Sequence, residues 1–164
     1  MSEQVVPDPI EFARGRKSIE GEIALKRLEG LRDSLASNDG VVHFKLTGFV
    51  NEGAAPGLRC EVQGVLKVLC QRCLGPMDYR LQIDNSLLLV DHEPDESEEV
   101  DPEAPDTIKI QRDLLVDTLV EEEILLALPM APHHAEDVCK GRPAAETGKL
   151  HPFAALAKLK TIKE

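Results

Sequence analysis

Residues 58–89 decide the fold, and they read LRCEVQGVLKVLCQRCLGPMDYRLQIDNSLLL. In the first half most even positions from Leu58 to Cys70 are apolar, and most of the residues between them are charged or amide-bearing. In the second half most odd positions from Met77 to Leu89 are apolar. Alternation with a period of two is typical of a half-buried strand. The connection is too short for a parallel crossover, so we expect an antiparallel hairpin.

Other segments predict what surrounds this hairpin. A turn signal at 37–40 precedes a strand over Val41–Val50, and Thr107–Ile110 is predicted to be a short strand. Asp113 is the expected N-cap of a helix that reaches about Leu128 and is ended by Pro129. Residues 7–35 carry apolar side chains at roughly helical spacing. Glycines interrupt that pattern, so it predicts short helices, or a helix with turns.

The main predicted helix has one apolar stripe with an acidic residue in it. Glu123 lies near the middle of this stripe. A carboxylate there more often reaches solvent or pairs with a base than takes part in catalysis, so we predict a structural role. The stripe consists of Leu115, Val116, Leu119, Val120, Leu126 and Ala127.

The length and the charge pattern set the domain organisation. The chain has 164 residues and a net charge of -11, and nine of its acidic side chains lie in residues 91–106, which contain no Lys or Arg. We expect this segment to be a mobile acidic loop. We predict one α+β domain over residues 1–142, with an antiparallel sheet, the long central hairpin, an N-terminal helical segment and one main helix after the acidic loop. Residues 143–164 are predicted to be a linker and a basic amphipathic C-terminal tail.

The composition also excludes several classes of function. No apolar stretch is long enough for a membrane span and the N-terminus does not resemble a signal peptide, so we expect a cytoplasmic protein. With 3% aromatic residues and no Trp, base-stacking platforms for single-stranded nucleic acid are not expected. No catalytic motif, Gly-rich phosphate loop or small-molecule site stands out. We therefore predict a binding protein and not an enzyme.

Two cysteines at the turn of the hairpin carry the strongest chemical signal. Cys70 and Cys73 are separated by two residues, a spacing that presents both sulfur atoms to one tetrahedral metal ion. The downstream candidates for the remaining ligands are His134 and Cys139, with His133 as the alternative to His134. We expect Cys60 to be a small core residue, and His43, His92 and His151 have no partner at metal-ligand spacing.

Three interpretations of the cysteine pair stay open. The first is a zinc site, which makes zinc the one expected cofactor, and the second is a pair of unligated thiols. The third is a redox centre. The strand pattern after Gly75-Pro76 argues against it, because such a centre needs a helix N-terminus at its first cysteine.

The order and spacing of several short motifs resemble those of the YceD family, the large ribosomal RNA subunit accumulation proteins. The resemblance covers most of the chain. It departs at His151, where the family usually has Asn, and in the length of the acidic loop. The motifs are Asp8–Arg16 with Arg27-Leu28, Leu69–Leu74, Glu121–Pro129, Pro132–His134 with Cys139, and His151–Lys160.

The resemblance implies a bacterial factor for accumulation of 23S ribosomal RNA, acting in its synthesis or processing or in assembly of the large subunit. It implies no established catalytic activity. The family's recurring positions fall on Cys70, Arg72, Cys73, Glu123, His134, Cys139 and the tail from Pro152 to Ala154. The partners would be components of ribosomal precursors, mainly proteins because the chain is acidic, with local contact to 23S ribosomal RNA.

Candidate contact residues lie around the hairpin and in the tail. Their simpler interpretation is a solvated surface. An enzyme with a thiol or zinc site (an oxidoreductase or a hydrolase) and a zinc-stabilised transcription accessory protein are the alternative functions. The candidates are Arg59, Lys67, Arg72, Arg80, Lys158 and Lys160, with Phe153 and Leu156 as apolar docking residues and Pro129 and Pro152 as structural residues.

Overall fold

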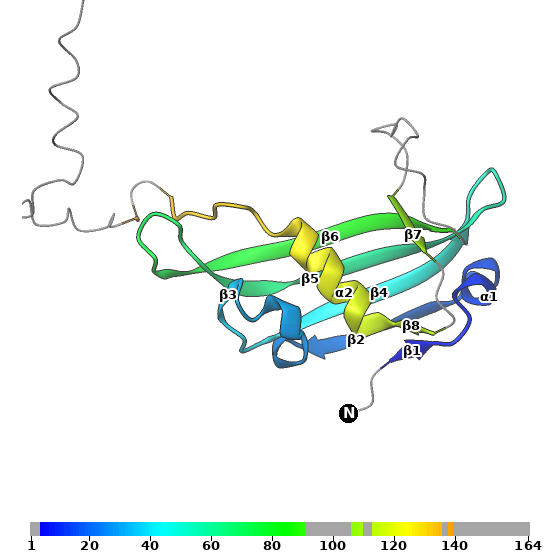
Figure 1. The fold of residues 1–164 in the computed structure, drawn as a ribbon, viewed down its shortest axis with the longest axis horizontal. Helices are drawn as coiled ribbons and strands as arrows, with labels where there is room; N and C mark the ends of the chain where they lie inside the picture. Colours follow the sequence, from blue (N-terminus) through cyan, green and yellow to red (C-terminus); the bar gives the residue numbers. More distant parts are fainter. Residues whose placement is uncertain (1–3, 91–105, 110–112, 136–137, 140–164) are drawn as a thin grey trace, which may run out of the picture.

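The long hairpin predicted from the alternating pattern forms the centre of a sheet (Figure 1). The computed structural model describes residues 4–90, 106–109, 113–135 and 138–139. Strand β5 (Pro56–Leu69) pairs antiparallel with β6 (Pro76–Val90), from Gly57 opposite Leu88 to Leu69 opposite Pro76. The turn with the two cysteines therefore lies at one end of the two longest strands described.

The remaining strands extend the sheet on both sides in the order β2-β4-β5-β6-β7. Strands β2 (Ser18–Ala24) and β4 (Val41–Val50) are antiparallel, and β3 (Leu35–Ser37) pairs with β5 beyond the end of β4. Strand β7 (Asp106–Lys109) confirms the predicted short strand near 107–110. It runs parallel to β6, however, so the sheet is mixed and not purely antiparallel.

The predicted N-terminal helical segment is wrong for most of its length. Helix α1 covers only Pro9–Arg14, and two short 3-10 turns, η1 (Leu25–Arg27) and η2 (Glu29–Leu31), follow β2. The error has a simple cause: Ile19 and Ile23 are four residues apart, a spacing that fits a helical turn and also two strand periods. The exposed Glu20 and Glu22 show that the period is two.

Helix α2 (Val116–Ala127) packs across one face of the sheet (Figure 1). It begins three residues after the predicted N-cap Asp113, because Leu114 and Leu115 form β8 and pair with β1 (Val5–Val6). Its end agrees with the prediction, since Leu128 is the C-cap and Pro129 follows. The predicted apolar stripe is wrong at Leu126, whose exposed fraction is 81%, and at Leu115, which lies in β8 and is 37% exposed.

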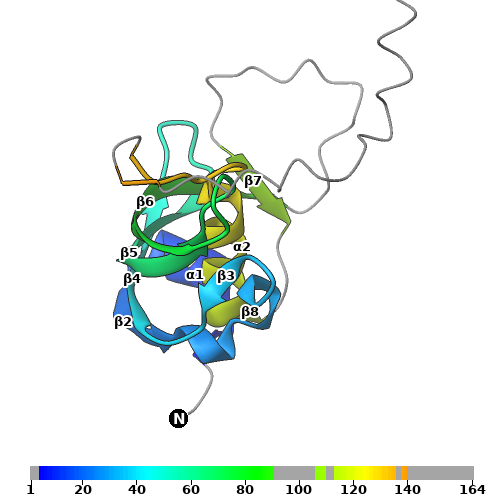
Figure 2. The same ribbon diagram turned by 90° about the vertical axis from the view of Figure 1, so that its left-hand side faces the viewer.

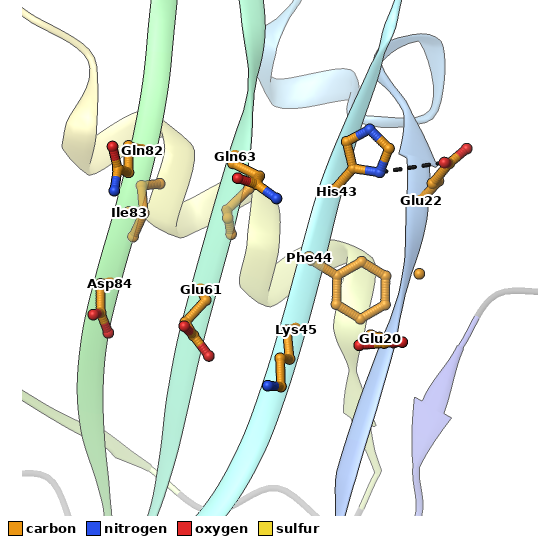
Figure 3. Close-up of a pocket in the computed structure, with 12 residues that line it drawn as sticks. Glu20, Glu22, His43, Phe44, Lys45, Glu61, Gln63, Gln82, Ile83 and Asp84 are labelled. Atoms are coloured by element: carbon orange, nitrogen blue, oxygen red, sulfur yellow. Dashed lines mark ion pairs between the residues drawn. The ribbon is translucent and has the colours of Figure 1, made fainter.

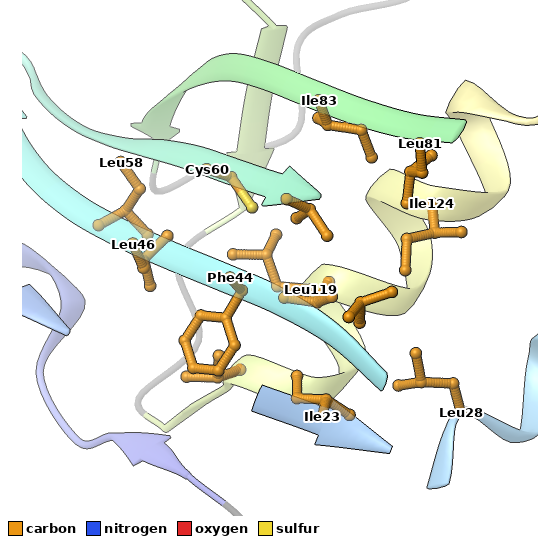
Figure 4. Close-up of a cluster of buried hydrophobic side chains, with 14 of the residues drawn as sticks. Ile23, Leu28, Phe44, Leu46, Leu58, Cys60, Leu81, Ile83, Leu119 and Ile124 are labelled. Atoms are coloured by element: carbon orange, nitrogen blue, oxygen red, sulfur yellow. The ribbon is translucent and has the colours of Figure 1, made fainter. Parts of the chain in front are cut away.

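The core lies between the sheet and α2 (Figure 4). Strands β4, β5 and β6 contribute the apolar half of their alternation, and α1 lies on the same side of the sheet as α2 (Figure 2). Two polar contacts fix the segment after β2 to α2: Arg27 pairs with Asp117 at 2.5 Å, and the Gly30 N–H donates to a Glu121 carboxylate oxygen. The largest fully buried side chains are Ile23, Leu25, Leu28, Leu31, Leu46, Leu58, Leu66 and Ile124, with Val42, Val62, Val116 and Val120.

Two predicted segments fall outside the described residues. These are the acidic loop, apart from Asp106, and the linker and tail over residues 143–164. Among the helices that the structure describes, none is long and apolar enough to cross a membrane.

Candidate functional site

The hairpin turn from Cys70 to Pro76 folds back on itself and brings its two cysteines together. The Cys70 N–H donates to the Gly75 carbonyl oxygen at 2.9 Å, and the Leu74 N–H donates to the Cys70 carbonyl oxygen at 2.8 Å. Leu74 adopts a φ of 58°, in the left-handed region that few residues other than glycine adopt. The turn is therefore held in an unusual backbone conformation by its own hydrogen bonds.

The segment after α2 crosses to this turn and supplies two more side chains. The Gln71 N–H donates to the Pro132 carbonyl oxygen at 2.8 Å, which fixes residues 132–135 against the hairpin. The Val138 and Cys139 amides both donate to the Ala135 carbonyl oxygen. These hydrogen bonds help to place Cys139 next to Cys70. Residues separated by more than 60 positions in the sequence thus meet at one point.

Four side chains converge there with the geometry of a metal site. The Cys70 and Cys139 sulfur atoms are 3.8 Å apart, and the Cys73 sulfur is 3.4 Å from His134 Nδ1. All four ligand atoms lie within 4.8 Å of one another. Tetrahedral zinc with Zn–S bonds of about 2.3 Å separates its sulfur ligands by about 3.8 Å. The cluster is therefore able to hold a metal ion, and three thiols with one imidazole are a donor set that zinc favours.

His134 is oriented for this role by a second hydrogen bond. Its Nε2 lies 3.2 Å from the Pro76 carbonyl oxygen, so Nε2–H donates there and Nδ1 is left with its lone pair toward Cys73. Metal-binding histidines typically donate their other ring N–H to a carbonyl or carboxylate, which fixes the tautomer. The neighbouring His133 is exposed, and its Nδ1 lies 3.2 Å from the His134 carbonyl oxygen, outside the cluster.

The surroundings also favour a thiolate at Cys70. Burial raises the pKa of its thiol, but the backbone amides of Cys73, His134 and Arg72 outweigh burial and lower the pKa to about 5. The Gly75 amide lowers the pKa of Cys73, but burial and the neighbouring cysteines prevail, and its pKa is raised. The pKa values of the two thiols are thus shifted in opposite directions, and a metal ion would bind both as thiolates.

The same geometry argues against the redox interpretation. No helix begins at Cys70, whose flanking residues form a turn and strands. The Cys70 side chain is fully buried, so an external disulfide has no path to its sulfur. The fourth cysteine, Cys60, is 1% exposed in the core, and burial raises its pKa to about 12, as expected for a packing residue.

The predicted cationic contact residues differ in how far they are engaged. Arg59 makes a bidentate pair with Asp84 across the hairpin, with both N–O distances 2.6 Å, and Lys67 pairs with Asp78 at 2.6 Å. Arg72 and Arg80 are exposed on the hairpin. The tail candidates Pro152, Phe153, Leu156, Lys158 and Lys160 lie outside the described residues.

Glu123 is buried, and its partner is an amide that the sequence analysis missed. Asn85 Nδ2 donates to Glu123 Oε2 and to Asp106 Oδ2, both at 3.2 Å. Glu123 is 6% exposed, and burial raises the pKa of its carboxyl group. Asn85 occupies an inward position between Ile83 and Leu87, so this polar break in an apolar alternation was the signal that could have found it.

We expect Glu123→Gln to stabilise the protein at neutral pH. The folded-state pKa of Glu123 is raised, so ionisation costs stability as pH rises above the unfolded value of about 4.5. Glutamine removes this cost and still accepts a hydrogen bond from Asn85. Denaturant unfolding at several pH values should show the advantage of the variant shrinking as pH falls toward 4.5. The exposed Glu52→Gln is the control, since Glu52 does not contribute to the pKa shift of Glu123, and an equal pH-dependent gain there would contradict the argument.

The chain is similar to known proteins over most of its length. The family model described as large ribosomal RNA subunit accumulation protein YceD matches residues 58–160, from the central hairpin into the tail. The chain is 28% identical over 164 residues to the large ribosomal RNA subunit accumulation protein YceD of Haemophilus influenzae, with 93% of each chain covered. No solved structure matches. The matched range contains nearly all of the central hairpin, helix α2 and the cysteine–histidine cluster. The chain therefore belongs to the YceD family.

Proposed function

We propose that this protein is a cytoplasmic binding factor that supports accumulation of 23S ribosomal RNA and assembly of the large ribosomal subunit. The first part of this proposal, a role in ribosomal RNA accumulation, is supported by the name of the Haemophilus relative. The second part, action by binding, is supported by a site whose four donor atoms lie within 4.8 Å of one another, so that they face one another.

We propose that Cys70, Cys73, His134 and Cys139 are the ligands of one zinc ion. Zinc would supply a rigid tetrahedral link between the hairpin turn and the segment after α2, with no reaction at the metal. A catalytic zinc site keeps one position open for water, whereas four protein donors complete the coordination. The cluster thus supports a structural role over the hydrolase alternative, and burial of Cys70 argues against an oxidoreductase.

The proposed contact surfaces lie at the hairpin and in the tail. Arg72 and Arg80 are exposed on the hairpin, as are Arg59 and Lys67, which pair with Asp84 and Asp78. We propose residues 1–142 as the domain and the basic tail as a second contact, with Phe153 and Leu156 as its apolar anchors. Partners are precursor proteins of the large subunit, with 23S ribosomal RNA touched locally.

Depletion of the protein from its host cells tests the proposed function. We expect fewer large subunits relative to small subunits in sucrose gradients and a reduced ratio of 23S to 16S ribosomal RNA, because the factor acts on one subunit. Re-expression of the wild-type chain should restore both ratios, and the double variant Arg72→Ala, Arg80→Ala should restore them less fully than the exposed control Lys17→Ala. Unchanged subunit ratios after depletion would contradict the function.

A further inference from the structure

Strand β2 leaves one edge of the sheet open. Its backbone pairs with β4 from Ser18 opposite Thr47 to Ala24 opposite Val41, and β2 ends the strand order on that side. The nearby β1 pairs with β8 in a separate two-stranded sheet. Within the described ranges, no strand occupies the other edge of β2. Backbone hydrogen bonds to β4 involve the odd-numbered positions, so the backbone donors and acceptors of the even-numbered residues point to the open edge, where they are a template for an added strand. These residues are Ser18, Glu20, Glu22 and Ala24.

The outer face beside this edge is hollow and acidic (Figure 3). The hollow measures about 490 Å³ and lies on the face opposite α2. Glu20 and Glu22, both exposed, contribute to it from the edge strand itself. Its charged lining consists of Glu20, Glu22, Glu61, Asp84, Lys45 and His43.

The carboxylates of this hollow outnumber the cations around it. Asp84 is engaged by Arg59, and Glu22 lies 3.2 Å from His43, a pair that is ionic only when the imidazole is protonated. Glu20 and Glu61 make no ion pair within the described part of the chain. They flank Lys45 across the strands, one lysine for two carboxylates. The hollow therefore retains a net negative charge next to an open backbone edge.

The charges of Glu20 and Glu22 argue against a second copy of this chain as the partner that binds the open edge of β2. Antiparallel self-pairing centred on Gly21 would place Glu20 of each copy opposite Glu22 of the other. Like charges directly opposite on neighbouring strands are destabilising. An extended segment with Lys or Arg at alternate positions would instead place its cations beside Glu20 and Glu22.

We propose that the β2 edge binds an extended, lysine- or arginine-rich segment of a partner protein by strand addition. Backbone hydrogen bonds along β2 provide affinity, and alternate basic side chains reach the hollow and provide selectivity. This inference rests on the binding role proposed above and names the chemical class of the partner. It also separates the partner site from the cysteine–histidine cluster, which lies on another part of the sheet.

Peptide binding to the purified full chain tests the proposal. The probe is a fluorescent seven-residue peptide of alternating lysine and threonine. The backbone control is the same peptide with its lysine backbone nitrogens methylated, which keeps the charge but removes the N–H donors that would face β2. Fluorescence anisotropy should show the unmodified peptide binding at least roughly tenfold tighter than the N-methylated peptide. The double variant Glu20→Gln, Glu22→Gln should lose roughly tenfold in affinity, the equivalent of about 1.4 kcal/mol, whereas the exposed control pair Asp33→Asn, Glu52→Gln should not.

Amide chemical shifts locate the bound peptide. We expect the largest changes at residues 18–24 and smaller changes at β6. Equal affinity for both peptides, no loss in the Glu20 and Glu22 variant, or shifts away from β2 would each overturn the proposal. None of these results bears on the depletion experiment, which measures subunit ratios in cells without the protein, so the two proposals fail separately.

Discussion

Replacing Cys73 by serine is expected to abolish stoichiometric zinc binding and to lower the free energy of unfolding by about 4 kcal/mol when zinc exceeds its dissociation constant a thousandfold. An ion that binds only the folded state stabilises that state. Loss of one thiolate from the cluster removes the ion and therefore its stabilising effect. Elemental mass spectrometry of purified protein measures the first effect. Thermal unfolding with and without a chelator measures the second.

The matched control is Cys60→Ala, a change of the same residue type outside the cluster. Cys60 lies in the core at 1% exposure, so its loss should cost some packing energy but leave one zinc per chain. Wild-type protein with far less than one zinc per chain, and a melting curve that a chelator does not shift, would remove zinc from the proposed function. The contacts of the hairpin turn with residues 132–135, such as the Gln71–Pro132 hydrogen bond, would then hold the segment alone.

Gly48→Ala is expected to be the most damaging single methyl addition in the sheet, at about 3 kcal/mol or more. The added Cβ would lie 2.5 Å from the Phe12 carbonyl oxygen and 2.6 Å from Ala13 Cα. Both are backbone atoms, which cannot rotate away as a side chain would. Helix α1 would have to leave β4, exposing Phe12 and Ala13, which are now buried. Urea unfolding measures the loss.

Gly53→Ala is the control for that prediction. Gly53 lies in the turn between β4 and β5, where an added Cβ would approach only the Asn51 side chain, at 3.5 Å. We expect a change within about 0.5 kcal/mol there. A Gly48 variant as stable as the Gly53 variant would show that α1 is not held where the structure places it.

The sequence predicted the parts of the fold that one local pattern decides. The alternation along β5 and β6 has one interpretation over more than ten residues, and the hairpin was confirmed with its turn in place. Strand β2 was missed because Ile19 and Ile23 fit two periods at once. The parallel direction of β7 depends on its pairing with β6, which no local pattern encodes.

The part of the candidate site that a local spacing defines was also predictable, but the rest was not. The spacing of Cys70 and Cys73 restricts their geometry, and the structure brings His134 and Cys139 to them as predicted. Whether zinc occupies the cluster stays a prediction. Asn85 was missed because its role depends on Glu123 from another element, and the open edge of β2 is a property of strand order, not of the residues in it.

The cysteine–histidine cluster also determines where the rest of the chain starts. The Cys139 sulfur lies 3.8 Å from the Cys70 sulfur, so the sequence beyond Cys139 continues from the hairpin turn and not from the end of α2. A short linker raises the effective concentration of one binding segment near another. Two weak contacts, one at the hairpin and one in the basic tail, would then act as a single bivalent attachment, and opening the cluster would separate them without altering either.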